Sequence, residues 1–402
     1  MAEEQRRDQH SGRLPGPLEI SGDNPRYFTV RTDNPARRRA VYLTGSHIWN
    51  NFHDGMGPGA TPPAEPERLD YDAYLDFLAA HGHNFIRLWR WEQFRSQAAG
   101  GAFHLNMTPQ PWPRTGPGTA KDGGPKFDLS RLDPAYFQRL RERVTRAGER
   151  GMYVAVMLFE GWALHLSPAP DNVEGHPCHP ANNVNGVGIT SIVDYHVLPL
   201  DPDVRALQEA YIRQVVDTVH DLPNVLYEVA NESSGGGAVD QEMAALLGVP
   251  LDTEWGDSTG WQYWVIDFVI LMDFGLIDGI QPAPDTPSFA AFEPARHAMG
   301  DTRRYAERID LIGMPPHGEL SSTGYALAHP GREYLILQPS EAGEAFTAAP
   351  AAGTYTAHWY GVNDRASRSG GELTVPGDEP VNFAPPPTIN GPAVLHLKRA
   401  SG

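Results

Sequence analysis

One short apolar segment, residues 225–232, most constrains how this chain can fold. It reads Val-Leu-Tyr-Glu-Val-Ala-Asn-Glu, follows turn-forming residues at 221–224 and precedes a Ser/Gly-rich segment at 233–237. Its length and apolar character predict a buried β-strand, and alternation places Glu228 and Glu232 on one face. A carboxylate at the carboxyl end of a buried parallel strand is where (β/α) barrels carry their chemistry. Glu232 is therefore a candidate catalytic residue, and a helix cap or a solvated side chain is the alternative.

Strands and helices alternate from residue 40 to this segment, after a hairpin expected at residues 18–33. Apolar runs predict strands at 40–43, 85–91, 152–159 and 225–232. Apolar residues at helical spacing predict helices from Tyr71 to about Gly82, from Pro134 to Gly151 and from about Pro202 onward. This alternation predicts parallel strands joined by right-handed crossovers. The long connections follow strands, which places them on the face where barrel enzymes build their sites.

The alternation breaks after the strand at 225–232. A helical pattern at 261–268 runs directly into a strand pattern at 270–275, although helix-to-strand connections usually take about 2–6 residues. One more helix, at 293–309, brings the total to five strand–helix units, too few to close an eight-stranded barrel. The alternatives are an incomplete barrel and a compact natural variant with a different repeat count.

Residues 321–402 differ in pattern from the rest of the chain. Short alternating runs separated by Gly and Pro predict strands near 324–328, 333–337, 353–359, 372–375 and 393–397. Such a series is typical of a small antiparallel β-sandwich. We therefore expect a barrel at 18–320 followed by a sandwich at 321–402.

Composition narrows the classes of partner. The 402 residues include 50 acidic and 32 basic side chains, for a net charge of −18, which disfavours nucleic acids and anionic membranes. The single cysteine, Cys178, excludes an internal disulfide. Residues 1–17 are polar without the apolar core of a signal peptide, and no apolar run approaches the roughly 20 residues that span a bilayer. We expect a disordered lead at 1–17 and a cytoplasmic protein.

The segment 223–232 resembles the fourth strand of the retaining glycosidase barrels of clan A, in which an Asn-Glu pair ends the strand. The segments 42–51, 83–92 and 298–308 look like one branch of these barrels, often described as carrying a collagen-binding C-terminal domain. In that branch the segment like 270–275 belongs to the eighth strand. The resemblance therefore implies a deletion of units five to seven near 269/270, about 90 residues at about 30 per unit. No collagen-binding chemistry is visible in residues 321–402.

The resemblance also implies catalytic roles. Glu232 is similar to the general acid/base, Asn231 to the residue that binds a sugar hydroxyl, and Arg87 to the arginine that orients the nucleophilic carboxylate. For Arg87 the alternative is an ion pair with Glu228. Retaining hydrolysis requires a second carboxyl group about 5–5.5 Å from the first. In the clan it ends strand seven, inside the segment that the resemblance implies is deleted here. The remaining carboxylates expected at strand ends are Glu92, Glu160 and Asp273.

Aromatic and polar side chains near the expected strand ends are candidates for sugar binding. Sugar rings pack their C–H faces on aromatic rings, while polar groups fix their orientation. The candidates are His47, Trp49, Trp89, Trp91, Glu92, Glu160 and Trp162, with Trp112 on the second long loop. The alternative is that some of these tryptophans belong to the core of a large domain.

The third long loop is rich in metal-binding residue types. It contains His165, His176, Cys178, His179 and His196. Their spacing matches no standard zinc motif, and an exposed loop collects histidines easily, so we expect no metal site. The Gly-rich segment at 235–237 lacks the Lys-Ser/Thr of a phosphate loop, and we expect no cofactor.

Together these features predict a TIM-type (β/α) barrel, incomplete, with a C-terminal antiparallel β-sandwich. The expected activity is hydrolysis of the O-glycosyl bond of a glycoside or oligosaccharide. The rival prediction is a carbohydrate-binding barrel without turnover, or a truncated and poorly folded product. The sequence leaves open the sugar, the linkage and the oligomeric state.

Overall fold

The computed structural model describes residues 14, 16–31, 39–46, 48–59, 61, 64–98, 103–161, 173–191, 193–231, 293–377 and 379–400. Contacts divide the chain into two compact units, one of residues 1–17 and 43–293 and one of residues 18–42 and 294–402. This division rests on contacts alone, and the predicted domain limits, 18–320 and 321–402, stay a prediction. The expected joint near 269/270 and nearly all of the expected lead lie outside the described residues.

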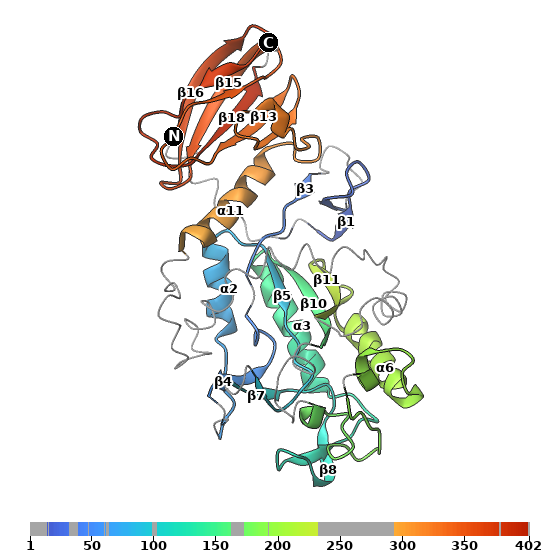
Figure 1. Cartoon of the computed structure of the whole chain (residues 1–402). Coiled ribbons are helices and arrows are strands. Elements are labelled where there is room, and N and C mark those ends of the chain that lie inside the picture. The colour runs from blue at the N-terminus through green and yellow to red at the C-terminus, as the bar shows by residue number, and fades with distance from the viewer. Residues whose placement is uncertain are drawn as a thin grey trace. The chain divides into compact units, whose positions relative to one another are not determined.

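The first unit is built on a parallel sheet of three strands (Figure 1). They are β5 (Phe85–Leu88), β10 (Tyr153–Glu160) and β11 (Val225–Asn231), in the order β11-β10-β5. Both pairings are parallel, as the alternation of strands and helices predicted. All eight residues of β10 are buried, as expected for a parallel strand covered on both faces.

Three helices follow the predicted pattern closely. They are α2 (Tyr71–Ala80), α3 (Pro134–Glu149) and α6 (Pro202–Val219), and α3 contacts both β10 and α6. The start of each is fixed locally, because the carboxylate of Asp70, Asp133 or Asp201 accepts a hydrogen bond from a backbone N–H of the first turn. In α3 and α6 a proline follows this cap, a position where its missing N–H costs nothing.

The expected first barrel strand at 40–43 is corrected by the structure. The predicted hairpin is confirmed as β1 (Leu18–Ile20) and β2 (Phe28–Val30), and β3 (Ala40–Val41) joins its sheet by antiparallel pairing with β2. Further along, the N–H of Thr44 donates to the side-chain carbonyl of Asn84, at 2.9 Å. The backbone N–H of Asn84 in turn donates to the carbonyl of Thr44, at 2.9 Å, so one backbone and one side-chain hydrogen bond join these two residues.

Two small antiparallel sheets that the sequence did not predict are formed by the connection after β5, with one strand, β4, supplied by the segment before α2. One contains β4 (Asp54–Pro58), β7 (Phe103–Thr108) and β6 (Ser96–Ala98), and the other contains β8 (Arg114–Thr119) and β9 (Pro125–Phe127). The guanidinium of Arg114 lies 4.5 Å from the ring centroid of Phe94 and 4.2 Å from that of Phe127. This cation–π stacking fastens the second sheet to the segment that follows β5.

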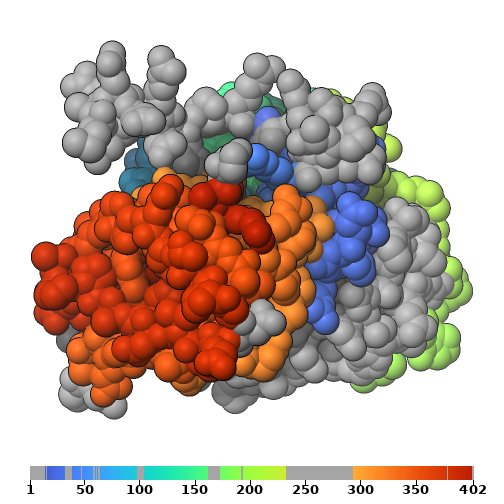
Figure 2. Space-filling model, turned by 90° about the horizontal axis from the view of Figure 1, so that it is seen from above, coloured from blue at the N-terminus to red at the C-terminus, as the bar shows by residue number. Residues whose placement is uncertain are grey.

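The second unit contains a five-stranded antiparallel sheet and a two-stranded ribbon, seen as one closely packed body in Figure 2. The sheet has the order β12 (Ala326–His329), β13 (Glu333–Gln338), β18 (Ala393–Arg399), β15 (Gly353–Gly361) and β16 (Ala366–Val375), and the ribbon pairs β14 (Phe346–Ala348) with β17 (Val381–Phe383). Their inward side chains form one core, which includes Tyr355, Trp359 and Leu395. The antiparallel strands predicted beyond residue 321 are thus confirmed. A short 3-10 helix, η6 (Gly318–Leu320), precedes the sheet.

The helix α11 (Glu293–Arg308) is also as predicted, and Asp301 ties it to the C-terminal sheet. The Asp301 carboxylate is 6% exposed and accepts hydrogen bonds from Arg365 at 2.9 and 3.0 Å. Arg304 and the hydroxyl of Tyr360 also bond to it. Burial alone would raise the pKa of Asp301, but the bonds from Arg365, Tyr360 and Arg304 outweigh burial and lower it. None of the described helices is long and apolar enough to cross a membrane.

We expect Asp301→Asn to lower the free energy of unfolding by about 2 kcal/mol, because it leaves two arginines without their shared carboxylate. The control is Asp364→Asn, which breaks the more exposed pair with Arg368 and should cost less than about 1 kcal/mol. Since the folded pKa of Asp301 is lowered, its contribution is present above about pH 4 and is lost as pH falls through the folded pKa. Denaturant unfolding at pH 7 and pH 3 measures both effects. Equal losses in the two variants at pH 7 would contradict this role.

Candidate functional site

Arg87 of β5 and Glu228 of β11 form an ion pair across the parallel sheet. Arg87 Nε lies 2.8 Å from Glu228 Oε2, and Arg87 Nη2 bonds to the other oxygen of the same carboxylate. The register explains the meeting, because β10 lies between them and pairs Ala155 with Arg87 and Met157 with Glu228. The ion pair that the sequence left as the alternative for Arg87 is therefore formed.

Asn231 links this ion pair to the end of β10. Its side-chain carbonyl accepts a hydrogen bond from Arg87 Nη2 at 3.1 Å, and its amide donates to Glu160 Oε1 at 3.3 Å. Asn231 and Glu160 are register partners at the carboxyl ends of β11 and β10, and the backbone N–H of Gly161 donates to the carbonyl of Asn231 at 2.8 Å. The sheet thus brings together three residues predicted for the site: Arg87, Asn231 and Glu160.

Glu92 lies beyond the end of β5 and is completely buried. Its Oε1 accepts a hydrogen bond from the backbone N–H of Glu160 at 3.0 Å, and its Oε2 lies 3.1 Å from His196 Nε2. Arg90 and His176 each approach the carboxylate to 3.8 Å. Burial would raise the pKa of Glu92, but the neighbouring His196, Arg90 and His176 lower it below its usual value. Glu92 is thus enclosed by these groups, and the sugar-binding role expected from the sequence stays a prediction.

The histidine-rich loop is buried where it meets Glu92, which corrects the expectation of an exposed loop. It comprises the 3-10 helix η3 (Val173–Gly175), a turn region and the short helix α5 (Val193–His196). His176 and Cys178 are both 0% exposed, and His196 is 2% exposed. No pattern in the sequence indicates this contact, because it joins residues far apart in the chain.

His176 is held as a neutral imidazole. Burial lowers its pKa to about 3, although the nearby Glu92 carboxylate opposes the shift. Its Nδ1 accepts a hydrogen bond from the backbone N–H of Cys178 at 3.0 Å. The proton of the neutral ring is therefore on Nε2, the nitrogen that faces Glu92. This arrangement suits a hydrogen-bond donor to a carboxylate and does not suit a metal ligand at Nε2.

Two of the tryptophans predicted to bind a sugar lie in the protein core. Trp89 and Trp91 are 3% and 1% exposed, and they pack in a cluster with Met56, Leu105, Met107 and Met157. The small sheet β4-β7-β6 supplies three of these partners, which is why neither ring presents an open face. Trp112 is likewise 2% exposed. The burial of these three side chains favours the alternative that they belong to the core, and their binding of a sugar stays a prediction.

Trp49 is the candidate ring that keeps part of its surface accessible among the described residues. It packs against the cluster from one side, with its ring centroid 6.3 Å from that of Trp89. Its backbone carbonyl also accepts a hydrogen bond from the indole N–H of Trp91. The predicted residues Glu232, His47, Trp162 and Asp273 lie outside the described residues, and their roles stay predictions.

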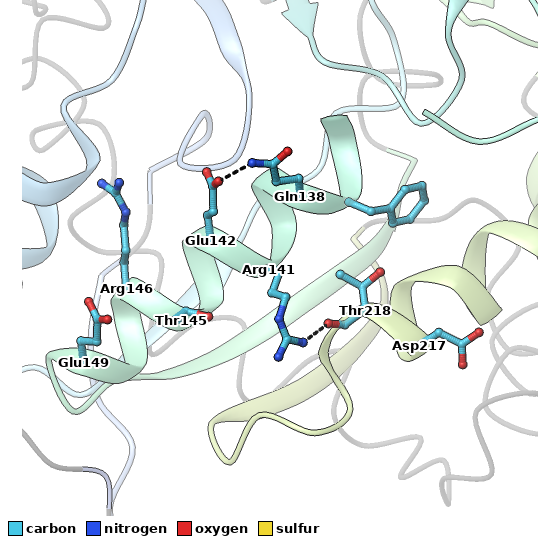
Figure 3. A pocket seen from close by; sticks show the side chains of 9 residues that line it. Gln138, Arg141, Glu142, Thr145, Arg146, Glu149, Asp217 and Thr218 are labelled. Atoms are coloured by element: carbon cyan, nitrogen blue, oxygen red, sulfur yellow. Dashed lines mark hydrogen bonds between the residues drawn. The ribbon is translucent and has the colours of Figure 1, made fainter. Parts of the chain in front are cut away.

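A shallow groove on the outer surface of this unit does not coincide with the strand ends (Figure 3). It has a volume of about 750 Å³ and lies between α3 and α6. Its lining residues are Phe137, Gln138, Arg141, Glu142, Thr145, Arg146, Glu149, Asp217 and Thr218. Arg141 is engaged by the Thr218 carbonyl at 2.6 Å, and Gln138 by Glu142 at 2.9 Å. The groove offers no tryptophan for a sugar ring.

Comparisons with known proteins show which fold this chain is similar to. A family model described as a domain of unknown function (DUF6298) matches residues 101–241, about a third of the chain. No curated protein shows a significant sequence match. A solved structure titled glycoside hydrolase is similar over 97% of this chain and 99% of its own, with 11% identity and a TM-score of 0.55. A family 5 glycoside hydrolase from Bacteroides vulgatus is similar over 96% of this chain and 95% of its own, with 11% identity and a TM-score of 0.54. The fold is therefore like that of glycoside hydrolases.

The buried His176 should make stability depend on pH. Its folded pKa, about 3, lies below the ordinary value of about 6.5, so protonation favours the unfolded chain. The contribution of the neutral His176 to the free energy of unfolding is complete above pH 6.5. It falls as pH drops toward 3, by at most about 1.4 kcal/mol per pH unit. His176→Asn keeps an acceptor for the Cys178 N–H and removes the titration, so its unfolding free energy should fall less steeply between pH 7 and pH 5. The control is the exposed His220→Asn, and equal slopes for wild type and His176→Asn would contradict the expectation.

A double-mutant cycle measures the ion pair of Arg87 with Glu228. Arg87→Met and Glu228→Gln should each destabilise the protein, and the double variant should recover a coupling energy of about 1–3 kcal/mol. A matched cycle on the exposed pair of Arg141 and Asp221 should give a smaller coupling, because solvent screens both charges. Denaturant unfolding provides all of these values. Coupling of Arg87 to Glu228 no larger than in the surface cycle would show that the pair is not structural.

Proposed function

We propose that this chain is a glycoside hydrolase-like protein that cleaves the O-glycosyl bond of a glycoside or oligosaccharide, with Glu232 as general acid/base. The observation that carries the proposal is the row of Arg87, Asn231 and Glu160 at the carboxyl ends of three parallel strands. Glu232 directly follows Asn231 in the sequence. Barrel enzymes place their chemistry at this edge of the sheet, and the likeness in fold to glycoside hydrolases supports the same reaction class.

The finer architecture belongs to the same proposal. We infer a (β/α) barrel without units five to seven, followed by a β-sandwich that acts as an accessory domain. The broken alternation near 269/270 supports the first inference. The five-stranded sheet and its ribbon around one core support the second. The branch of clan A barrels described as having a collagen-binding domain remains the proposed family.

A carbohydrate-binding protein without turnover is the second candidate, and one observation favours it. Retaining hydrolysis needs a second carboxylate free to attack the anomeric carbon. Of the carboxylates available, Glu92 is enclosed by His196, Arg90 and His176. Glu160 is 0% exposed and accepts a hydrogen bond from Asn231. In this candidate the strand ends bind a sugar and do not cleave it.

Turnover of two aryl glycosides by wild type and Glu232→Gln tests the proposal. An acid is needed most when the departing phenol is a poor leaving group, so the variant should lose at least about 100-fold in kcat/KM on a phenyl glycoside. The loss should be smaller on a dinitrophenyl glycoside, whose phenolate departs without a proton. The control is Glu142→Gln on the exposed surface of α3.

Three outcomes separate the candidates. A larger loss on the phenyl glycoside assigns the acid role to Glu232. Equal losses on both substrates contradict that role. A folded wild type that binds oligosaccharides, measured by tryptophan fluorescence, but hydrolyses neither substrate supports the binding protein.

A further inference from the structure

The Glu92 carboxylate joins three parts of the first unit that are distant in sequence. It lies just beyond β5, accepts the backbone N–H of Glu160 at the end of β10, and contacts His196 of α5. All three residues are at most 2% exposed. The Glu92 carboxylate thus connects the ends of β5 and β10 to the loop that follows β10.

The loop is fastened beside Glu92 at further points. The backbone N–H of Phe94 donates to the carbonyl of Gly175 at 2.9 Å. A Cβ built on Gly175 would lie 1.6 Å from the carbonyl oxygen of Arg95, so only glycine allows the loop to approach so closely. His176 follows directly and places its Nε2 at 3.8 Å from Glu92 Oε2.

From these contacts we propose that Glu92 is a positioning residue for the strand-end site and not a contact for the sugar. Its Oε1 holds the backbone of Glu160, and the side chain of Glu160 in turn accepts the hydrogen bond from Asn231. His196 lies within hydrogen-bond distance of Oε2, at 3.1 Å, and the His176 ring packs beside it with its Nε2 at 3.8 Å. This inference rests on the proposed function, because Asn231 directly precedes the proposed acid/base Glu232.

The charges around Glu92 suit this role. The groups that face it are His196 and His176 from the loop and Arg90 from its own segment. Arg90 is itself fixed, since its guanidinium lies 4.1 Å from the ring centroid of Tyr211 on α6 and donates to the backbone carbonyl of Leu158. An ionised carboxylate in this setting accepts a stronger hydrogen bond from the Glu160 N–H than a neutral group would.

Amide hydrogen exchange measures the clamp on Glu160 without any substrate. In Glu92→Ala the Glu160 N–H loses its acceptor, so peptides that end β10 at residues 158–161 should exchange at least about tenfold faster. Glu92→Gln keeps a carbonyl acceptor and should restore most of the protection. The matched control is Glu333→Gln in the second unit, which breaks the pair of Glu333 with His396, at 2.7 Å, and should leave residues 158–161 unchanged.

A second variant, His196→Gln, tests the same contacts in case Glu92→Ala does not fold. It retains Glu92 and loosens only the loop, so residues 190–197 should exchange faster while residues 158–161 keep most of their protection. If residues 158–161 exchange at the wild-type rate in a folded Glu92→Ala, confirmed by circular dichroism, the clamp does not exist and the proposal is wrong.

Kinetics on the phenyl glycoside separate positioning from substrate contact. A positioning residue should lower kcat, here by about tenfold or more in Glu92→Ala, with KM changed less than about twofold and with rescue in Glu92→Gln. A rise in KM with kcat unchanged would mean that Glu92 touches the sugar, and would overturn the proposal. If wild type neither hydrolyses nor binds a sugar, the proposed function fails, and the role of Glu92 at the site fails with it. The exchange experiment then still decides whether Glu92 clamps Glu160.

Discussion

The burial of β10 is the constraint on which the first unit depends. Every residue of this strand is buried, and it pairs on both sides with parallel neighbours. The carboxyl end of this strand is also buried, so the polar side chains there, Glu160, Asn231 and Glu92, are removed from solvent on folding. Burying a charge without a partner costs far more than a single hydrogen bond provides, and each carboxylate at this end therefore needs a donor or a cation.

The polar contacts at the strand ends follow from that requirement. Glu160 ends β10 and accepts a hydrogen bond from Asn231. Glu228 pairs with Arg87, and Glu92 lies beside Arg90, at 3.8 Å, and within hydrogen-bond distance of His196, at 3.1 Å. The loop at 173–196 is folded inward because it supplies one of these partners. The same desolvation that makes the contacts necessary is what gives a strand-end site its strong electrostatics.

Elements defined by local chemistry could be predicted from the sequence. The Asp133-Pro134 pair marks the start of α3 because the cap and the proline act within one turn. The run at 152–159 marks β10 because its apolar length suffices. Elements that depend on partners far along the chain could not be predicted. His176 and His196 reach Glu92 across about 80 to 100 residues, and no spacing in the sequence records this meeting.

The residues of the candidate site show the same difference between local and long-range signals. The resemblance to clan A barrels singled out Arg87 and Asn231, the apolar run at 152–159 placed Glu160 at a strand end, and the sheet brings the three together. The resemblance could not show that Trp89 and Trp91 are covered, because Met56 of β4 and Leu105 of β7 pack on them from two separate connections, one before α2 and one after β5. Tryptophan near a strand end satisfies a sugar platform and a core equally well, and only the packing of a separate segment decides between them.

The side-chain amide of Asn231 is oriented by buried hydrogen bonds at both its carbonyl oxygen and its nitrogen. Its carbonyl is engaged by Arg87 and its N–H by Glu160, which fixes the orientation of the amide without any ligand. An asparagine side chain has two N–H donors and two lone pairs, so one of each is left over by these described contacts. A sugar hydroxyl that both donates and accepts could use them without displacing Arg87 or Glu160. The free-energy cost of orienting the Asn231 amide is then already covered by folding and is not incurred on binding, which is the physical basis of a preorganised site.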